Sequence, residues 1–468
     1  MRTRAYVRLL VLAAVLGVPI SAAAYWYLKL VALMQTWVFT DLPDGLGFHG
    51  EPAWWPLLPL TVAGALVGPT IKYLPGRGGH SPADGFRAGG VALPAELPGI
   101  TLASLTSLSL GVVIGPEAPL IAIGGGLAYL AVKLARRDIP QRTGAVIAAA
   151  GSFAAVSTLL GSPLAGAFLL MEASGLGGAA ATIVMVPGLL GAGIGSLIFL
   201  GLNSLTGYGT FSLAVPHLPA FTHLDVSEFG WAVAIGVAAA FFCWALKRSA
   251  LAIRPHVERR IVLATPVIGL AIGGLAAVYA LDSGKPSSDV LFSGQDQLGP
   301  LILHSAGYSV GALLLLIVCK GLAYTGALSS FRGGPTFPAM FLGAAGGIAL
   351  SHLPGLPLIA GVAIGMGAMT AGMLRLPLTA VLLTTLFLGS DGITALPLVI
   401  VAVVLSYVLV IWLAGPPAPA TPAASPATAP PAPVTAPVPA AGGQAPVGAS
   451  PAAGGASWPA RLVDWARR

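Results

Sequence analysis

The feature that most restricts the fold of this chain is a succession of apolar runs, nearly free of charge, that break repeatedly at glycine or proline. Only 8% of the 468 residues are charged, and 56% are hydrophobic. Inside a bilayer every backbone polar group must be bonded within the protein, so such runs are expected to be helices. Several runs are too short for a hydrocarbon core of about 30 Å, which needs about 20 residues. The sequence therefore predicts an all-α polytopic membrane protein with broken helices that meet inside it.

The basic residues gather in short patches between the apolar runs, and the net charge is +7. Such patches are topology signals, because cytoplasmic loops of membrane proteins are enriched in Lys and Arg. The patches at 133–142 and 247–260 predict cytoplasmic loops. The start of the chain has the form of a secretory signal, but its apolar run continues to Phe39, which predicts a first membrane helix. We expect a multi-pass protein of the cell (plasma) membrane with both termini cytoplasmic and no nucleic-acid partner.

The chain divides into a membrane domain and a tail. We expect a transmembrane domain at 1–414, with a first half at about 40–203 and a second half at about 226–414. Residues 415–457 are almost wholly Pro, Ala, Gly, Thr and Ser, which predicts disorder. Residues 458–468 place two Trp and one Leu at near-helical spacing among arginines, so they form either a short amphipathic helix or a solvated end.

Other chemistries find little support in the sequence. The two cysteines, Cys243 and Cys319, lie inside apolar runs, which is typical of small buried side chains. No metal site and no cofactor are expected. His80 and Ser81 lack a suitable orienting acid for hydrolysis, and no phosphate-binding loop is present for ATP-driven transport. We therefore expect a transport protein and not an enzyme.

One carboxylate stands in the middle of apolar sequence, in Gly115-Pro116-Glu117-Ala118-Pro119. An ionisable residue at such depth is costly and is by default functional. Pro119 suits the first position of a helix, which places Glu117 just before a helix N-terminus. Such an end attracts anions, because its backbone N–H groups are unpaired and carry partial positive charge. Glu117 is thus interpreted as a tethered anion that can occupy and vacate a site meant for a free one.

The spacing of the Gly and Pro residues indicates an internal repeat. The stretch 115–119 has the same length as 334–338, and 151–163 has the same length as 365–377. The first pair is offset by 219 residues and the second by 214. Duplicated halves with helices broken at matching places point to a substrate site at their interface, near the bilayer midplane. Chance matching is the alternative, because the chain holds 62 Gly and 40 Pro.

Three stretches, in this order, resemble the motifs of the CLC chloride channels and proton-coupled chloride transporters. Residues 115–119 are similar to the motif Gly-(Lys/Arg)-Glu-Gly-Pro, and 333–338 match Gly-Gly-x-Phe-x-Pro in part. Residues 365–380 resemble the pattern that ends in Arg-x-Pro-Leu-Thr-Ala. The resemblance covers about residues 76–413. It implies a CLC-type fold of two inverted-topology helical repeats, a homodimer in the lipid bilayer, and one pathway per subunit for chloride and similar anions.

The resemblance also implies a site. Glu117 matches the gating glutamate, whose side chain blocks the pathway when ionised and moves away when protonated or displaced. The family's first anion motif, Gly-Ser-Gly-Ile-Pro, is here Gly-Gly-His-Ser-Pro at 78–82, so either Gly79 or Ser81 fills its serine position. Chloride is suited by several weak donors, since it must both enter and leave. The residues implied in anion binding are Gly79, Ser81, Gly115, Ala118, Thr336 and Phe337.

The chain departs from the family at several positions that bear on mechanism. Pro116 replaces a basic residue, and the tyrosine after the last long helix has no counterpart, since Tyr407 lies within that helix. Ala173 stands where the family's transporters carry an inner proton-relay glutamate, and alanine cannot carry a proton. Glu172 is either a substitute relay or a structural residue at a helix end. We therefore expect a chloride conductor that is passive or only loosely proton-coupled and is gated by Glu117. A proton-coupled antiporter and a cation-coupled solute symporter are the alternatives.

Two further cations lie in or near apolar runs, Lys320 and Arg375. Each either places its charge beside the anion pathway, or reaches to an interface or a helix C-terminus. For Arg375, between two short helices, we favour the second interpretation.

Overall fold

The computed structural model describes residues 3–86, 91–135, 141–160, 162–175, 178–208, 215, 218–219, 221 and 224–415. The expected tail from residue 416 onward and the expected amphipathic helix at 458–468 lie outside these residues. Within the described part, the regular structure is helical apart from an isolated β-bridge between Gly115 and Gly334.

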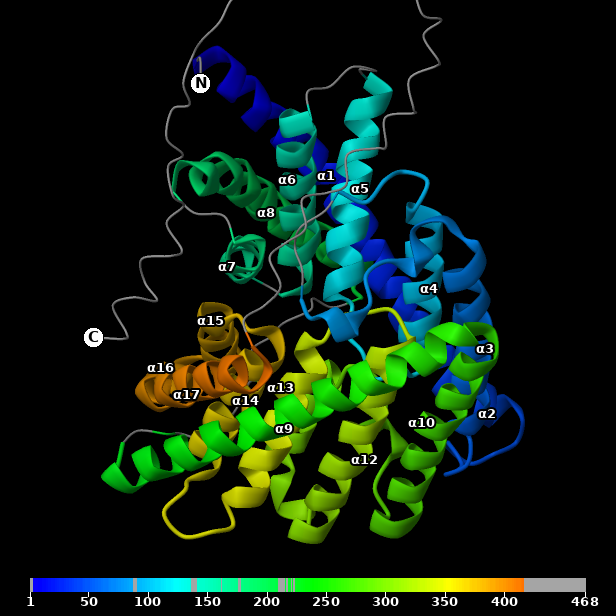
Figure 1. The fold of residues 1–468 in the computed structure, drawn as a ribbon, viewed down its shortest axis with the longest axis vertical. Coiled ribbons are helices and arrows are strands. Elements are labelled where there is room, and N and C mark those ends of the chain that lie inside the picture. Colours follow the sequence, from blue (N-terminus) through cyan, green and yellow to red (C-terminus); the bar gives the residue numbers. More distant parts are fainter. Residues whose placement is uncertain are drawn as a thin grey trace, which may run out of the picture. The chain divides into compact units, whose positions relative to one another are not determined.

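The first half of the chain forms a group of helices that follows the expected apolar runs (Figure 1). They are α1 (Thr3–Thr36), a π-helical turn at Trp37–Asp41, α2 (Leu42–Gly45), α3 (Leu57–Tyr73), 3-10 turns at Pro75–Gly78 and Pro82–Asp84, α4 (Leu97–Ser109), α5 (Glu117–Ala135), α6 (Gln141–Leu159), α7 (Pro163–Ser174) and α8 (Gly178–Thr206).

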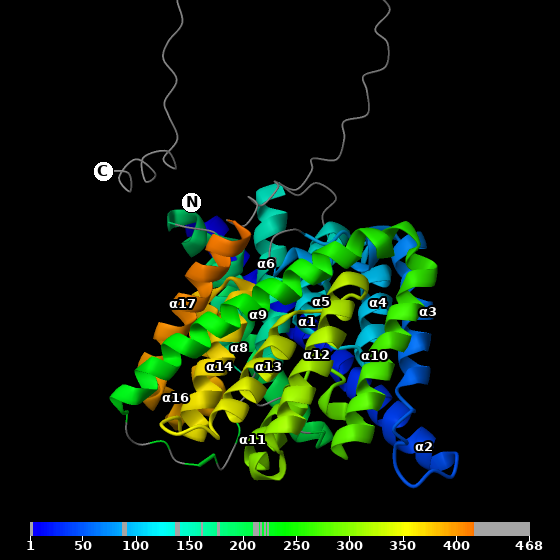
Figure 2. The same ribbon diagram turned by 60° about the horizontal axis from the view of Figure 1, so that its bottom comes forward.

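The second half repeats this mixture of long and short helices, and α9 runs obliquely across α12 and α14 (Figures 1 and 2). Its helices are α9 (Val226–Arg259), α10 (Ile261–Ser283), a 3-10 turn at Ser287–Asp289, α11 (Gln295–Leu303), a 3-10 turn at Ser305–Gly307, α12 (Val310–Ser330), α13 (Thr336–Leu350), α14 (Leu358–Leu374), α15 (Pro377–Leu388), α16 (Ser390–Thr394) and α17 (Leu396–Ala414).

Two helix boundaries differ from what the apolar runs alone indicate. The apolar run at 301–324 is divided between α11 and α12. The break follows from Ser309, whose hydroxyl accepts a hydrogen bond from Ala312 N at 3.1 Å and so caps a new helix. α5 begins at Glu117 instead of Pro119, because Leu120 N already donates to Pro116 O at 3.0 Å. Glu117 is therefore in the first helical turn and not just before it.

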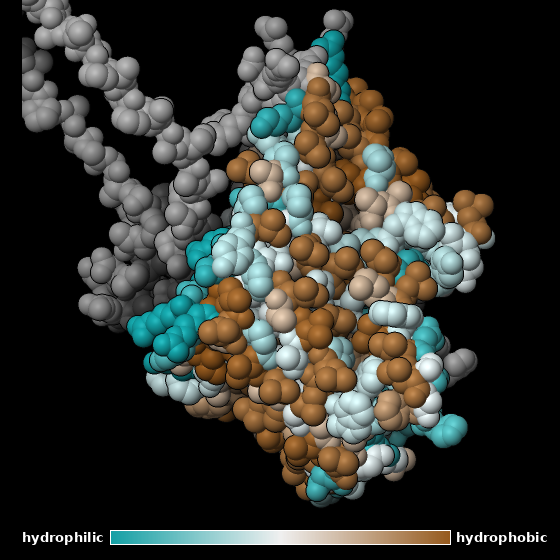
Figure 3. All heavy atoms as spheres, turned by 90° about the vertical axis from the view of Figure 1, so that its right-hand side faces the viewer, coloured by the Kyte–Doolittle hydropathy of each residue, from teal (hydrophilic) through white to brown (hydrophobic). Residues whose placement is uncertain are grey.

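The lengths of the helices agree with a membrane protein that contains broken helices. Within the described part of the chain, seven helices are long and apolar enough to cross a membrane, and seven more are apolar but only 10–17 residues long. Apolar side chains such as Leu58 and Leu66 of α3, and Leu263 and Val267 of α10, are exposed. Figure 3 shows the largely apolar surface on this side of the molecule. Such a surface suits contact with lipid.

The internal repeat is visible in two helix crossings built in the same way. In the first half α5 and α6 cross at Gly124 and Gly151, and a Cβ on Gly124 would lie 2.6 Å from Gly151 O. In the second half α13 and α14 cross at Gly343 and Gly365, where a Cβ on either would collide with the carbonyl oxygen of the other. The offsets between corresponding glycines are again 219 and 214 residues. Small residues let membrane helices approach closely, and here they do so at equivalent places in both halves.

Candidate functional site

The two halves meet through their backbones immediately before α5 and α13. Gly115 N donates to Gly334 O at 2.7 Å, and Gly334 N donates to Gly115 O at 2.6 Å. These glycines occupy equivalent positions in the repeat, offset by 219 residues. The N-termini of α5 and α13 are therefore brought together, and each supplies backbone N–H groups that its own helix leaves unpaired.

Glu117 lies at this junction with its side chain completely buried. Its Oε1 accepts a hydrogen bond from Thr336 N at 2.6 Å, and Thr336 is the residue equivalent to Glu117 in the other half. Its Oε2 has no hydrogen-bond partner among the described residues. A Cβ on Gly115 or on Gly334 would collide with this carboxylate. The absence of side chains at these two glycines therefore makes the room that the carboxylate fills.

A buried tyrosine, not singled out in the sequence, supports the loop before α13. The hydroxyl of Tyr324 on α12 donates to Pro335 O at 2.7 Å, and the side chain is fully buried. This bond fixes the peptide just before Thr336, whose N–H group holds Glu117. In the sequence, Tyr324 is the tyrosine of the apolar run that leads into the Gly333–Pro338 motif.

A small cavity of about 60 Å³ lies against the N-terminal turn of α5. It is lined by Gly79 and Ser81 from the first half's loop, by Ala118 of α5, and by Arg332 and Pro335 before α13. The Ser81 hydroxyl is buried and has no hydrogen-bond partner in the described part of the chain. Hydroxyl and backbone donors that face a cavity are suited to a weakly held anion.

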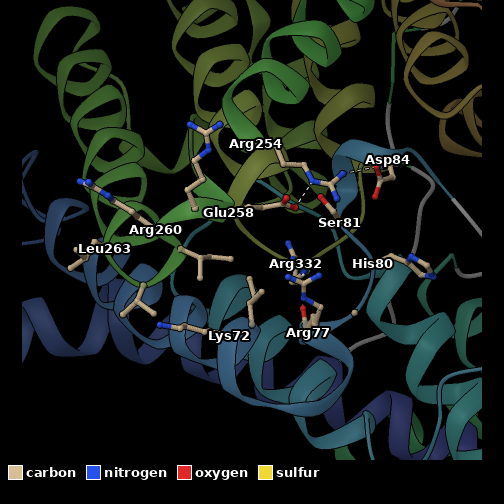
Figure 4. A pocket seen from close by; sticks show the side chains of 15 residues that line it. Lys72, Arg77, His80, Ser81, Asp84, Arg254, Glu258, Arg260, Leu263 and Arg332 are labelled. Atoms are coloured by element: carbon tan, nitrogen blue, oxygen red, sulfur yellow. Dashed lines mark hydrogen bonds and ion pairs between the residues drawn. The ribbon is translucent and has the colours of Figure 1, made fainter. Parts of the chain in front are cut away.

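A larger vestibule of about 510 Å³ adjoins this inner cavity (Figure 4). Two carboxylates line it, Asp84 and Glu258, and both are bonded by Arg254, at 2.6 and 2.7 Å. The vestibule thus has an excess of positive charge, which raises the local concentration of anions. Its cationic side chains are Lys72, Arg77, Arg254, Arg259, Arg260 and Arg332.

The expected site residues fall into two groups and one separate position. Glu117 is bonded to Thr336 N, and its carboxylate lies beside Gly115. Phe337 follows Thr336 in the first turn of α13 with its side chain buried. The second group, around the inner cavity, is Gly79, Ser81 and Ala118.

Glu172 lies elsewhere, at the start of α15. Its carboxylate accepts hydrogen bonds from Leu378 N at 2.9 Å, Thr379 N at 2.7 Å and Thr379 Oγ1 at 2.6 Å. This arrangement caps the N-terminus of α15 with a side chain from α7. A negative charge is stabilised there by the helix dipole and by the unpaired N–H groups.

The two remaining candidate cations bind backbone carbonyls. Lys320 is fully buried, and its Nζ donates to the carbonyl oxygens of Asp289, Val290 and Leu291 at 2.9, 3.1 and 2.9 Å. Burial raises the pKa of the Asp289 carboxyl, which lies in the loop outside the spans. Arg375 ends α14 in a left-handed conformation and donates to Gly415 O at 3.2 Å. Lys320 therefore fastens a loop to α12, and Arg375 terminates a helix.

Comparisons of the sequence with known proteins give one consistent match. The sequence model of the family described as "Voltage gated chloride channel" matches residues 89–410. The "Putative ion-transport protein YfeO" of Escherichia fergusonii is 28% identical over 365 residues, which are 76% of this chain and 82% of that protein. The protein of the same name from Salmonella typhimurium is 29% identical over 362 residues, which are 76% and 84% of the two chains.

Solved structures resemble the fold as well. A slow cyanobacterial Cl⁻/H⁺ antiporter matches with a TM-score of 0.70 and 21% identity, over 87% of this chain and 95% of that one. A CLC-type fluoride/proton antiporter matches with a TM-score of 0.66 and 18% identity, over 87% and 96%. The expected fold of two inverted-topology helical repeats with broken helices is thereby confirmed.

Proposed function

The chain belongs to the voltage gated chloride channel family, and on this premise we propose that it conducts chloride and similar anions along a pathway gated by Glu117. Members of this family are membrane transport proteins, and the chain is accordingly not an enzyme. The observation that carries the proposal is the bond from Thr336 N to the wholly buried Glu117 carboxylate, at 2.6 Å. A carboxylate held by the N-terminal N–H of a second helix occupies the kind of position in which a free anion binds.

The gate works by competition between two anions for the same donors. An ionised Glu117 takes the Thr336 N–H, and the glycines at 115 and 334 leave space that its carboxylate fills. Protonation removes the charge that holds the side chain there, and chloride then takes the vacated donors. In this proposal Thr336, Phe337 and Ala118 supply backbone donors near the gate. Gly115, which was also expected to bind the anion, does not, because its N–H is bonded to Gly334 O.

The inner part of the pathway is proposed to run from the basic vestibule through the inner cavity. Ser81, with Gly79 beside it, supplies the binding position there, and its buried hydroxyl is free to donate to an anion. Ser81 lines both cavities, as Gly79 does, which supports either residue as the counterpart of the family's serine. Each of these donors is weak on its own, so the anion can leave as readily as it enters.

Proton coupling is not part of this proposal. The position of the inner relay is Ala173, and the carboxylate of Glu172 is held by three hydrogen bonds at the start of α15. Both oxygens of this carboxylate are used in capping α15, which fixes the side chain in one position. We propose a structural role for Glu172.

We further propose that the protein is a homodimer in the plasma membrane and that both of its termini are cytoplasmic. α9 and α17 both end at the upper edge of the helical unit in Figure 2. α9 carries basic residues toward that end, which supports a cytoplasmic location. α7 and α15 are in contact and expose Leu164, Phe168 and Leu378, which supports an apolar surface that a second copy could cover.

Flux from proteoliposomes tests the function. Vesicles loaded with potassium chloride are followed with a chloride electrode and a pH electrode after a potassium ionophore is added. We expect chloride release without stoichiometric proton uptake, because no inner proton carrier is available. Proton uptake in a fixed ratio to chloride would instead establish the antiporter, and sodium-dependent solute uptake the symporter. Vesicles without protein serve as the control.

Substitution of Glu172 separates a cap from a relay. Glu172→Ala removes a charged acceptor of three hydrogen bonds, each worth about 1.5–3 kcal/mol when one partner is charged. We expect a lower thermal unfolding midpoint in detergent, while chloride flux and its pH dependence stay within twofold of wild type. Thr379→Val removes only the hydroxyl bond and is expected to lower the midpoint less. An unchanged midpoint with altered proton movement would contradict the structural role.

A further inference from the structure

The vestibule and the inner cavity share part of their lining, and this shared part marks the passage between them. The residues that line both are Gly79, His80, Ser81 and Arg332. Figure 4 shows Arg332 in the centre of the group, between Arg77 on one side and Ser81 and Glu258 on the other. An anion that moves from the vestibule toward Glu117 passes this guanidinium.

Arg332 is a buried cation whose bonded partners are carbonyl oxygens. Its side chain is 8% exposed, its Nε donates to Arg77 O at 3.2 Å, and its Nη1 donates to Phe331 O at 3.1 Å. Among the residues that the structure describes, no carboxylate lies within ion-pair distance of it. The two carboxylates of the vestibule, Asp84 and Glu258, are bonded to Arg254 instead. A guanidinium has five N–H donors, so three remain for another acceptor. A buried charge without a counter-ion is costly, and an anion that enters the cavity would relieve that cost.

Ser81 provides an independent sign of a ligand at the same place. Ser81 is only 7% exposed, and its buried hydroxyl has no hydrogen-bond partner in the described chain. It lines the same two cavities as Arg332. Two buried donors, one charged and one neutral, therefore face the same passage with bonding capacity to spare.

We propose that Arg332 binds the permeant anion at this passage, together with Ser81, and that the site prefers a planar monovalent oxyanion such as nitrate or hydrogencarbonate to a halide. This inference rests on the proposed function and specifies its substrate class. The guanidinium presents its N–H groups as a rigid planar fork, which matches two coplanar oxygens of one acceptor. A spherical halide gains the charge but not the paired geometry. Pro116 replaces the basic residue that the family motif places beside the glutamate. Arg332 thus supplies a positive charge elsewhere on the pathway.

Two substitutions of Arg332 separate its charge from its geometry. Arg332→Lys keeps the charge and loses the fork, so we expect chloride flux to continue while the preference for nitrate over chloride falls toward unity. Arg332→Gln removes the charge as well, so the concentration for half-maximal flux is expected to rise about tenfold for both anions, which corresponds to about 1.4 kcal/mol. The measurements are electrode-based flux of the two anions in proteoliposomes, and calorimetric titration of the purified protein with nitrate.

Arg260→Gln is the matched control, because Arg260 lines the vestibule but not the inner cavity. It is expected to leave the ratio of nitrate to chloride flux unchanged. If Arg332→Gln folds and alters neither half-saturation nor the ratio, Arg332 only holds the loop carbonyls and the inference is overturned. If Arg332→Gln does not fold, Arg332→Lys provides the test. A nitrate-to-chloride flux ratio near unity in that variant supports the inference, and the wild-type ratio overturns it. Absence of any anion flux in the wild-type protein would overturn the proposed function, whereas nitrate binding that depends on Arg332 would still support the site.

Discussion

Replacement of Glu117 by Gln is expected to leave chloride flux intact or raised and to remove its dependence on pH. In the wild-type protein the ionised carboxylate holds the Thr336 N–H, and acid frees that donor by neutralising the side chain. Where the carboxylate is mostly ionised, its neutral fraction rises about tenfold for each unit of falling pH. Wild-type flux should therefore increase as pH falls. Glutamine neither ionises nor titrates, so its flux–pH profile is expected to be flat.

The measurement is chloride release from proteoliposomes between pH 4.5 and 7.5, a range of about three units that begins at the ordinary titration of a carboxyl group. Glu117→Asp is an informative partner, since it still titrates but its shorter side chain does not match the distance to Thr336 N. It should retain pH dependence with altered flux. Glu258→Gln, which changes a vestibule carboxylate, controls for a general effect of charge and is expected to keep the wild-type profile. Acid activation that persists in Glu117→Gln would exclude this residue as the gate.

The position of Glu117 supports its proposed role as a gate. It begins α5, and its acceptor bond comes from the first residue of α13, so two helix N-termini converge on one carboxylate. Each terminus contributes partial positive charge and unpaired N–H groups. Partial charges of this kind allow an anion both to bind and to leave. The inference on Arg332 places a full charge at the passage farther along the route, in the lining that the two cavities share.

Local signals were sufficient where Gly and Pro mark helix ends. The apolar runs at 358–374 and 377–389 correspond closely to α14 and α15, because proline sits at or just before their starts. The apolar run at 301–324 contains no such proline and is broken instead at Ser309, which caps a new helix. A serine before an apolar run is a helix-start signal, so the information was present in the sequence.

Other features depend on contacts between distant segments and could not be read locally. Arg332 reaches Arg77 O across 255 residues of sequence, and Lys320 binds carbonyls about thirty residues before it. The acceptors in these bonds are backbone carbonyl oxygens, so the identity of the accepting residues gives no indication of the contact. The repeat offset did connect Glu117 with Thr336, and it succeeded because the pseudo-symmetric halves meet at equivalent residues. Resemblance and repeat together led to the contact between Glu117 and Thr336, but not to the vestibule.

The crossing of α13 and α14 should be highly sensitive to one methyl group. A Cβ on Gly347 would collide with the backbone of Gly361, and Gly361 in turn would place its Cβ 2.7 Å from Gly347 O. Rigid helix backbones cannot move locally, so Gly347→Ala is expected to separate the two helices. Overpacking of this kind costs typically 1–3 kcal/mol and sometimes more. We expect a strong loss of folded protein after solubilisation, and a lower thermal midpoint in what remains.

Gly346→Ala provides the matched control on the same helix, because nothing lies within 4 Å of a Cβ at that position. Both changes add the same methyl group and gain about the same 1 kcal/mol of helix propensity, so their difference isolates the helix contact. Gly346→Ala should be as stable as wild type or slightly more stable. The crossing also positions α13, whose first residue donates to Glu117, so any folded Gly347→Ala protein should show altered acid dependence of flux. Equal stability of the two variants would mean that α13 and α14 are not held together at these glycines.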